Sequence, residues 1–421
     1  MKRYVGLYYA SLNLTVVVKS FLKIFIRLMT PREKLHLKLV SLLTKNYGAG
    51  HWFCFSSGRG AIAFMLKAAG IGNGDEVVVS AYTCLAVPTA VLALGAKPVY
   101  VDIDSDSLSM TIDMVVKLVT PATKAIVVQH TLGNIFPIDK LEEKLDLRGI
   151  IIIEDCALSI GSKINGCNVG FRGDASIFSM ELSKTISCGW GGLLLINNVK
   201  YLSSAINLYS KVAYPNLFKS SKDSFQTLVS AFSYQPLLFH IIGKYLIAIF
   251  YRLRLFRNST TTAEVMGIFS NNFVQKLGEP QTAIAEIQWK RFNEVAIKCA
   301  ENFYEIANAA TNLGYKVHLP KSQVEYSVSN RVSLLVKDPA EMVNYFGLEN
   351  IELGRWFDGP LSPSPVNKVF NYKLKKFPQA TKTAKHVVNI PSHSGLTIGD
   401  KDKIITLLRA YSCKHSHAYI D

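Results

Sequence analysis

The sequence predicts an α/β protein with a large domain, whose mostly parallel sheet is covered by helices on both faces, and a smaller C-terminal α/β domain. The first observation is that short β-rich runs alternate with helical runs between about residues 53 and 196. The second is a long amphipathic pattern at 282–310, which predicts one helix leading into a second domain. The third is a pair of strand-like runs, NRVSLLVK and HVVNIP, followed by the helical pattern DKDKIITLLRAYS.

Composition narrows the class of partner. The 421 residues carry a net charge of +16, which favours an anionic partner such as nucleic acid, an acidic lipid or a phosphorylated small molecule. Nucleic acid is disfavoured because the basic residues adjoin large aliphatic ones rather than an exposed aromatic and basic face. The seven cysteines are scattered, without a C-x-x-C pair or a His/Cys cluster at metal spacing. This favours a reducing cytoplasm and disfavours a metal site.

Residues 1–45 are predicted to form an N-terminal basic amphipathic segment. Lys19, Lys23 and Arg27 recur every four residues and so form one basic stripe on a helix. The preceding apolar run, 4–18, is shorter than the roughly 20 residues that a membrane span requires. The helix is therefore expected either to pack on the protein body or a partner subunit, or to lie on a membrane surface.

The large cofactor-binding domain is predicted at 46–200. In this range WFCF leads into SSGRGAIAF, EVVVS leads into TCLAVPTAV, and the runs KPVYVDI, KAIVVQH, GIIIIED and ASIFSM follow. Strands that alternate with helices in this way build a largely parallel sheet. Ligands of such sheets bind at the carboxyl ends of the strands, which is where the unusual residues of this sequence fall.

An apolar and basic insertion is predicted at 201–266, where the alternation stops. Its run 236–258 carries His240 and Lys244 inside an apolar stretch and ends in three arginines. A full membrane span would bury Lys244 at a cost of about 2.5 kcal/mol or more, so the run predicts a buried helix, a subunit contact or a contact with one membrane face. The remaining chain is expected to form the linking long helix at 267–310, the small domain at 311–413 and a mobile tail at 414–421.

The run SSGRGAIAF predicts a strand end, a turn of small residues and a helix start. Backbone N–H groups at a helix start favour a phosphate. Gly58 and Gly60 allow a close approach, and Arg59 adds a charged donor. Because many strand-to-helix turns use Ser and Gly, an ordinary turn is the alternative.

The run IIIIEDCALSIG predicts an aliphatic strand that delivers Glu154 and Asp155 to its carboxyl end. Either acid could cap the following turn, a role that fits Glu154 better than Asp155. A carboxylate beside a protonated heterocyclic nitrogen would hold that proton in place. Pyridoxal phosphate needs such a partner to act as an electron sink.

Lys184 lies between the strand-like run SIFSM and the glycine-rich CGWGG. A lysine suits imine formation with an aldehyde because its pKa falls readily when the amine is partly buried. Ser179, five residues earlier, could reach the same phosphate as the turn at 56–60. An ordinary loop lysine is the alternative. The order of a phosphate turn, a carboxylate, a serine and a lysine nevertheless favours a pyridoxal phosphate site.

Together these motifs resemble the DegT/StrS-type sugar aminotransferases, and so do the runs SAYTCLAVPTAVLALGAKPVYVDID, QHTLGN and VVNIPSHSGLTIGD. The resemblance covers about 50–200 well and 267–410 loosely. It implies a fold type I pyridoxal phosphate enzyme that aminates a keto-sugar carried on a nucleotide. It also implies a homodimer with its active sites at the subunit boundary.

The resemblance assigns roles to single residues. Lys184 corresponds to the lysine that binds the cofactor aldehyde and moves a proton, and Asp155 to the partner of the pyridine nitrogen. The cofactor phosphate is expected at Gly58, Arg59, Gly60 and Ser179. Retention of Lys184 argues against the dehydrating branch of the family, which has histidine there.

The sequence departs from the family pattern at two expected cofactor contacts. Cys84 stands where an aromatic ring commonly stacks on the cofactor, and Tyr82 could take over that contact. Leu158 stands where the family often has Gln or His near the phenolic oxygen of the cofactor. His130, in QHTLGN, could approach the active site or be an ordinary structural histidine.

These expectations combine into one leading hypothesis. The protein is expected to be a pyridoxal phosphate-dependent aminotransferase for a keto-sugar nucleotide in surface glycan biosynthesis, with an amino acid donor that the resemblance suggests is glutamate. It is expected to be a cytoplasmic homodimer, with peripheral contact at the inner face of the membrane and no nucleic-acid partner. Two alternatives stay open. One is a catalytically impaired relative that acts as a membrane-associated scaffold or regulator, and the other is an elimination or decarboxylation enzyme.

Overall fold

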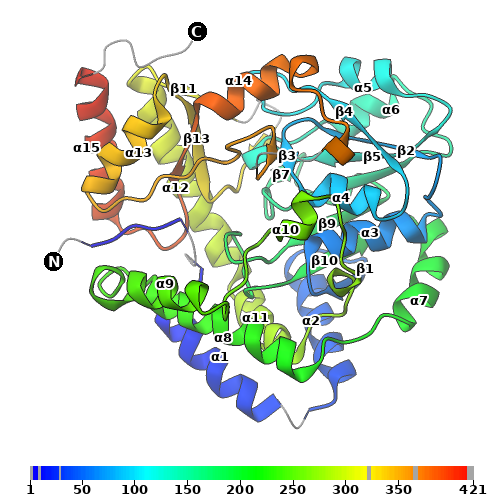
Figure 1. Ribbon diagram of the computed structural model, residues 1–421, viewed down its shortest axis with the longest axis horizontal. Helices are drawn as coiled ribbons and strands as arrows, with labels where there is room; N and C mark the ends of the chain where they lie inside the picture. Colours follow the sequence, from blue (N-terminus) through cyan, green and yellow to red (C-terminus); the bar gives the residue numbers. More distant parts are fainter. Residues whose placement is uncertain (1–2, 8–10, 28–29, 320–323, 364–367, 415–421) are drawn as a thin grey trace.

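The computed structural model describes residues 3–7, 11–27, 30–319, 324–363 and 368–414 (Figure 1). Within these residues the main sheet has seven strands in the order β1-β10-β9-β6-β5-β2-β4. Strand β10 runs antiparallel to both neighbours, and the other strands run parallel to one another. The strands are β1 (His51–Phe55), β2 (Glu76–Ser80), β4 (Lys97–Val101), β5 (Thr123–Gln129), β6 (Ile151–Asp155), β9 (Ala175–Ser179) and β10 (Gly192–Ile196).

Helices cover both faces of this sheet, because successive strand side chains point to opposite faces and are apolar on both. Ile153 of β6 faces one core and Ile152 faces the other. The first face packs against α3 (Gly58–Ala68), α4 (Ala86–Leu92), α7 (Leu202–Ser210) and α14 (Pro378–His386). The second packs against α2 (Arg32–Asn46), α5 (Ile112–Leu118), α6 (Ile138–Glu142) and α11 (Glu279–Lys290). The predicted mostly parallel sheet with helices on both faces is confirmed.

A smaller C-terminal unit has its own core. Its antiparallel sheet has the order β11-β13-β15, with β11 (Lys316–Val317), β13 (Arg331–Leu335) and β15 (Val387–Pro391). Three helices pack on this core: α12 (Phe292–Asn312), α13 (Pro339–Leu348) and α15 (Ile398–Lys414). The predicted small α/β unit is therefore present, while the predicted boundaries of the individual parts stay predictions.

Short strands connect the two units. β14 (Leu361–Ser362) of the C-terminal unit pairs in parallel with β3 (Thr83–Cys84), so it lies next to the predicted site residue Cys84. A second small sheet joins β12 (Val324–Tyr326), β7 (Lys163–Ile164) and β8 (Cys167–Asn168).

The prediction of one long helix at 282–310 is wrong, because the chain forms α11 and α12 with a break at Arg291. There φ is −105° and ψ is 9°, and the N–H of Arg291 donates to the carbonyl of Gln288 at 3.0 Å. The two helices serve different cores: Trp289 at the end of α11 is buried in the large domain, whereas α12 continues into the C-terminal unit. An amphipathic pattern alone does not show such a change of direction.

The N-terminal helix α1 (Leu14–Arg27) packs on α11 and on α8 (Leu217–Ser233). Lys23 forms an ion pair with the buried Glu286 at 3.0 Å, whereas Lys19 is exposed. Of the predicted basic stripe, Lys23 therefore faces the protein body and Lys19 faces solvent, while the Arg27 side chain lies outside the described part of the structure. Of the two alternatives for this helix, the structure shows packing on the protein body.

Residues 201–266 form α7, which packs on the main sheet, followed by α8, α9 (Lys244–Arg252) and the short α10 (Thr262–Val265). A π-helical turn at Phe239–Gly243 precedes α9, which lies against α8 (Figure 1). Because α9 buries none of its residues, the buried-helix alternative for this run is wrong, and the subunit and membrane contacts stay predictions. Among the described residues, every helix is too short or too polar to cross a membrane. Of the predicted tail, only Lys414 is described and it ends α15; residues 415–421 lie outside the described part.

Candidate functional site

The predicted motifs meet at the carboxyl ends of the parallel strands. A cavity of about 160 Å³ is lined there by six predicted site residues: Gly58, Arg59, Cys84, Asp155, Ser179 and Lys184. β6 ends in Asp155, β9 ends in Ser179, and α3 begins directly after β1. Because neighbouring parallel strands end at one sheet edge, residues far apart in the sequence share one cavity. The motifs that follow one another in the sequence therefore lie together in one cavity at the edge of the sheet.

Lys184 lies half-buried in the loop that follows β9. Burial lowers the pKa of its ammonium group and the nearby Arg331 guanidinium acts in the same direction, while the Glu181 carboxylate opposes them. The amine makes no hydrogen bond or ion pair with the described part of the chain. A lowered pKa increases the fraction of neutral amine near neutral pH, and the neutral amine is the nucleophilic form.

The C-terminal unit holds the lysine loop in place. Asn330 Nδ2 donates to the carbonyl oxygen of Ser183 at 2.8 Å, and Arg331 Nη2 donates to the same oxygen at 3.2 Å. Within the loop, Ser183 donates from its N–H and its hydroxyl to the Glu181 carboxylate at 2.9 and 2.7 Å. The residue before Lys184 is thus fixed from both sides, which limits the positions that the lysine amine can reach.

Asp155 is buried, and burial raises the pKa of its carboxyl group, although the positive charge of Lys184 opposes this shift. One carboxyl oxygen accepts from the N–H of Ala157 at 3.0 Å. A cation placed beside Asp155 would favour the carboxylate form again. The site therefore offers a buried acid that can stabilise a positive charge on a ligand.

Glu154, one residue earlier, points to the other face of the sheet. Its carboxylate accepts hydrogen bonds from the N–H groups of Gly170, Arg172 and Gly173 at 2.7–2.9 Å. It also bonds His130 Nε2 at 2.9 Å. Of the predicted roles for the two acids, Glu154 therefore has the structural one. His130 is a buried partner of Glu154 and does not line the cavity.

The turn at 56–60 is arranged differently from the prediction. The Ser57 hydroxyl caps α3 by accepting from the N–H of Gly60 at 3.1 Å. Gly60 does not line the cavity; a Cβ atom there would lie 1.9 Å from the carbonyl oxygen of Phe273, so glycine is needed for that close approach. Arg59 lines the cavity, but its guanidinium bonds the Glu264 carboxylate and the Ser259 carbonyl.

Two further predicted residues do not reach the cavity. The Tyr82 ring is fully buried; its hydroxyl oxygen accepts from the N–H of Phe357 at 2.7 Å, and its ring contacts the Phe357 ring edge to face. Leu158 packs against the apolar core, while its neighbour Ala157 lines the cavity instead. Tyr82 therefore does not replace the aromatic ring that is missing at Cys84.

Sequence reasoning missed much of the cavity wall. Trp190, Trp356 and the inserted residues 257–261 line it. Trp190 lies in the run CGWGG, which predicts a flexible turn from its glycines but gives no sign that the tryptophan ring lines a cavity. Arg331, whose guanidinium lies 3.2 Å from the centre of the Trp356 ring, was visible only as a basic residue at the start of a strand. Pairings between such distant segments leave no local sequence signal.

A larger cavity of about 720 Å³ adjoins the first and shares part of its wall. The shared residues include Cys84, Glu181, Trp190, Arg257 and Trp356. The larger cavity extends to Tyr234 directly after α8, to Ile247 and Tyr251 of α9, and to residues 352–358 of the C-terminal unit. A small reactive pocket thus continues into a space that can hold a bigger molecule.

Comparison with known proteins identifies the family. The family model of the DegT/DnrJ/EryC1/StrS aminotransferases matches residues 37–234 and 248–409. The segments outside the match are the first 36 residues, the inserted residues 235–247 and the last 12 residues. The match therefore includes every residue that lines the smaller cavity.

Curated relatives match over different lengths. The L-glutamine:2-deoxy-scyllo-inosose aminotransferase of Streptomyces kanamyceticus is 42% identical over 137 residues, 32% of this chain and 32% of that protein. The GDP-perosamine synthase of Vibrio cholerae is 35% identical over 158 residues, 38% and 43% of the two chains. The chain thus spans about a third to two-fifths of these relatives. The pleiotropic regulatory protein of Geobacillus stearothermophilus is 26% identical over 348 residues, 82% and 80% of the two chains.

Solved structures extend the likeness over the whole fold. The crystal structure of DesV from S. venezuelae has a TM-score of 0.73 to this chain, with 20% identity over 98% of this chain and 99% of that one. At this identity the likeness establishes the fold, which is that of the fold type I aminotransferases.

Proposed function

Because the chain belongs to the DegT/DnrJ/EryC1/StrS aminotransferase family, we propose that it is a pyridoxal phosphate-dependent enzyme that aminates the keto group of a nucleotide-linked sugar. The observation that carries this proposal is that Lys184, Asp155 and Ser179 line one cavity that continues into a larger one. The name of the Vibrio cholerae relative, GDP-perosamine synthase, supports a nucleotide-linked substrate. We propose that the larger cavity receives it.

The residues of the smaller cavity fit pyridoxal phosphate. The amine of Lys184 suits an aldehyde, the buried carboxyl of Asp155 suits a protonated ring nitrogen, and Ser179 with the start of α3 offers donors to a phosphate. When bound, the cofactor supplies an aldehyde and an electron-withdrawing ring. Cys84 lines the same cavity with a thiol, where the family resemblance implies an aromatic ring.

In this proposal Lys184 moves the proton during the reaction. A neutral amine can accept a proton at one carbon and return it at another, and burial favours the neutral form by lowering the pKa of this amine. Asn330 and Arg331 hold the preceding carbonyl, so the amine stays within reach of the reacting atoms. The rings of Trp190 and Trp356 line the cavity and reduce the access of water.

The enzyme proposal is tested with purified protein and added pyridoxal phosphate. The wild type should develop a visible absorbance band, and Lys184→Ala should not. An amino donor should bleach the band, and a keto-sugar linked to GDP or UDP should restore it. Glutamate and glutamine are compared as donors, because one relative is named for L-glutamine. A wild type that takes up no cofactor would contradict the proposal.

We further propose that the enzyme is a cytoplasmic homodimer that serves surface glycan biosynthesis. The family resemblance supports the homodimer, and the seven cysteines, which form no disulfide in the described part of the chain, support a reducing compartment. Sedimentation of the purified protein tests the dimer directly; a monomer at all concentrations would contradict it.

Peripheral membrane contact is also part of the proposal, and α9 with its flanking turns is the surface that we assign to it. Five apolar residues recur every four positions there, and each is between 51% and 62% exposed: Leu237, Ile241, Tyr245, Ile249 and Leu253. Lys244 and Arg252 beside them are exposed, and residues 224–263 contain no Asp or Glu. An apolar stripe with basic neighbours matches an anionic lipid surface.

Vesicle flotation tests this surface. The wild type should float with vesicles that contain phosphatidylglycerol and not with phosphatidylcholine alone, and Ile241→Glu with Ile249→Glu should abolish flotation. The matched control is Leu348→Glu with Ile398→Glu, which places two charges at exposed apolar positions of the C-terminal unit. If the α9 double variant instead converts a dimer to a monomer, the stripe is a subunit interface and the membrane assignment is wrong.

A second candidate function is a membrane-associated regulator without transaminase activity. The Geobacillus stearothermophilus relative, which matches most of this chain, is named a pleiotropic regulatory protein, and Cys84 departs from the family pattern. This candidate predicts that the protein transfers no amino group to any keto-sugar nucleotide, whether or not it takes up the cofactor. Turnover with one such substrate would exclude it.

A further inference from the structure

Arg257 of the inserted segment lies where the two cavities meet. It lines both of them, together with Asn258, Ser259 and Thr260. Its side chain is 29% exposed; burial lowers the pKa of the Arg257 guanidinium, and the nearby positive charge of Arg59, at the start of α3, acts in the same direction. A cation thus stands between the turn at 56–60 and the larger cavity.

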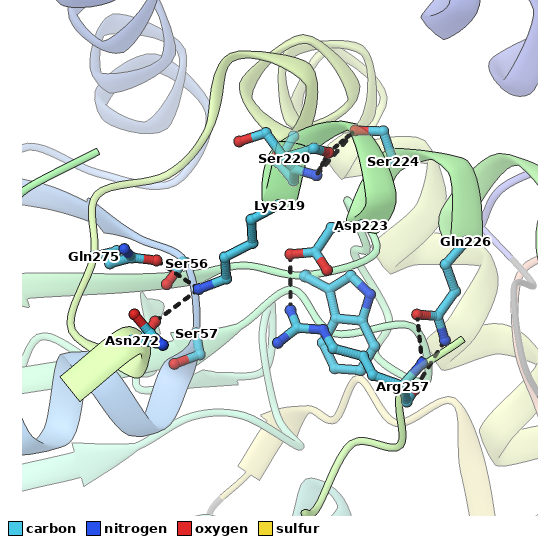
Figure 2. A network of polar contacts seen from close by, with 12 residues as sticks. Ser56, Ser57, Lys219, Ser220, Asp223, Ser224, Gln226, Arg257, Asn272 and Gln275 are labelled. Atoms are coloured by element: carbon cyan, nitrogen blue, oxygen red, sulfur yellow. Dashed lines mark hydrogen bonds and ion pairs between the residues drawn. The ribbon is translucent and has the colours of Figure 1, made fainter. Parts of the chain in front are cut away.

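Contacts from α8 hold this arginine (Figure 2), and so does a contact from the glycine-rich loop. The guanidinium lies 3.9 Å from the centre of the Trp190 ring, and Nη2 bonds Asp223 Oδ2 at 2.9 Å. The Gln226 side chain bonds the Arg257 backbone on both sides, accepting from its N–H at 3.1 Å and donating to its carbonyl at 2.9 Å. The position of the side chain is therefore set before any ligand arrives.

The guanidinium has donors to spare. Among the described residues, only one of its five N–H bonds has an acceptor, that of Nη2 to Asp223, and Nε is buried without a hydrogen-bond partner. Buried polar groups are almost always hydrogen-bonded, and an unmet donor on a charged group is costly. An acceptor from outside the chain would satisfy Nε.

Charges of both signs surround Arg257: the carboxylates of Asp223, Glu264 and Glu181 and the guanidinium of Arg59 all act on it. Lys219, four residues before Asp223 on α8, donates from Nζ to the Asn272 carbonyl at 2.9 Å and to the Gln275 side chain (Figure 2). These acceptors are neutral, so Asp223 is the one carboxylate that α8 places near the two cations, and Glu264 is already bonded to Arg59. The unmet N–H groups of Arg257 therefore suit a ligand that brings its own acceptor oxygens, as an oxyanion does.

We propose that Arg257 is a phosphate-binding residue of the site, held in position by Asp223, Gln226 and Trp190. A guanidinium presents paired N–H groups that match the oxygens of a phosphate. The inference rests on the proposed function for the source of the phosphate. That source is either the cofactor, through the smaller cavity, or the nucleotide part of the substrate, through the larger one.

Binding titrations of the full-length protein separate the two sources. Arg257→Gln is compared with the wild type for pyridoxal phosphate against pyridoxal, and for UDP and GDP against uridine and guanosine. Loss of a charge-assisted phosphate contact should weaken one phosphate ligand by about tenfold or more and leave its phosphate-free analogue unchanged. The control is Arg252→Gln, which removes an exposed charge from the same segment without touching either cavity.

Arg257→Lys keeps the charge without the paired donors. If Arg257→Gln melts at a lower temperature than the wild type, Arg257→Lys should restore the melting temperature. It should still bind the phosphate ligand several-fold more weakly than the wild type does. Equal binding of all phosphate ligands by the Arg257 and Arg252 variants would overturn the inference. So would a loss confined to glutamate or glutamine. If the wild type takes up no pyridoxal phosphate, the proposed function fails while the UDP and GDP titrations still decide the role of Arg257.

Discussion

The main sheet and the inserted segment 201–266 both contribute to the cavity, but different forces hold their residues in place. Strands β6 and β9, buried on both faces, present Asp155 and Ser179 at their ends. In the insertion α9 buries nothing, and Arg257 depends on side-chain bonds to α8. Apolar burial positions the half of the site at the strand ends, whereas a few polar contacts position the outer half. The two regions should therefore respond differently to substitution.

The largest contrast is expected in stability. Ile153→Ala in β6 removes a side chain with 0% exposure and should lower the free energy of unfolding by about 2–5 kcal/mol. Ile249→Ala on α9, where the side chain is 51% exposed, should change it by less than about 0.5 kcal/mol. Denaturant unfolding of both variants measures the difference. Equal losses would show that α9 is packed in a way that the single chain does not reveal.

The second contrast lies within β6. Asp155→Asn keeps the shape and the hydrogen bond from Ala157 but loses the negative charge, so it should lower kcat/KM by about 100-fold or more with little change in melting temperature. Glu154→Gln alters a side chain that bonds three backbone N–H groups and His130 away from the cavity. It should lower the melting temperature and leave kcat nearly unchanged. If Glu154→Gln lowered kcat/KM and Asp155→Asn lowered only the melting temperature, Glu154 rather than Asp155 would face the site.

A third effect concerns the contact between the C-terminal unit and the lysine loop. Asn330→Ala removes the 2.8 Å bond to the Ser183 carbonyl and should lower kcat by about tenfold, because the amine of Lys184 is less well positioned. Asn302→Ala removes an equivalent 2.8 Å bond to the His393 carbonyl within the C-terminal unit. Steady-state kinetics and thermal melts should show similar destabilisation by both variants and a kcat defect only at Asn330. A similar kcat for the two variants would contradict the role of Asn330 in positioning Lys184.

The smallest effect follows from the lowered pKa of Lys184. Between that lowered value and the ordinary 10.5, the unfolded chain binds a proton that the folded protein does not. Burial of the amine therefore costs stability at low and neutral pH, and the cost disappears as the pH rises past the ordinary value. Lys184→Met should raise the melting temperature of the cofactor-free protein by about 2 °C at pH 7 and less at pH 10. If Lys184→Met melted at a lower temperature than the wild type at pH 7, the lowered pKa of Lys184 would be contradicted.

The half of the site at the strand ends could be predicted because its signals are local. Asp155 and Ser179 end aliphatic strands, and Lys184 follows at short range, so strand periodicity and the order of motifs were sufficient. The same reasoning failed where a side chain has a partner far away in the sequence. Arg59 pairs with Glu264, and Gly60 makes room for Phe273. Neither partner can be inferred from the turn itself.

The outer half was beyond sequence reasoning for a related reason. Arg257 was noticed only as one of three arginines that end an apolar run, because its contact with Trp190 joins segments that are 67 positions apart. The break at Arg291 was missed because amphipathic periodicity continues across it while the helices move from one core to another. Tertiary contacts decided both outcomes.

The measurement that tests the central claim most directly is borohydride reduction of the protein in the presence of pyridoxal phosphate, followed by peptide mass analysis. The proposed site predicts one modified peptide, attached at Lys184, at a cofactor concentration that leaves exposed lysines unmodified. Modification spread over surface lysines, with Lys184 no more reactive than the others, would contradict the claim that this cavity holds the cofactor.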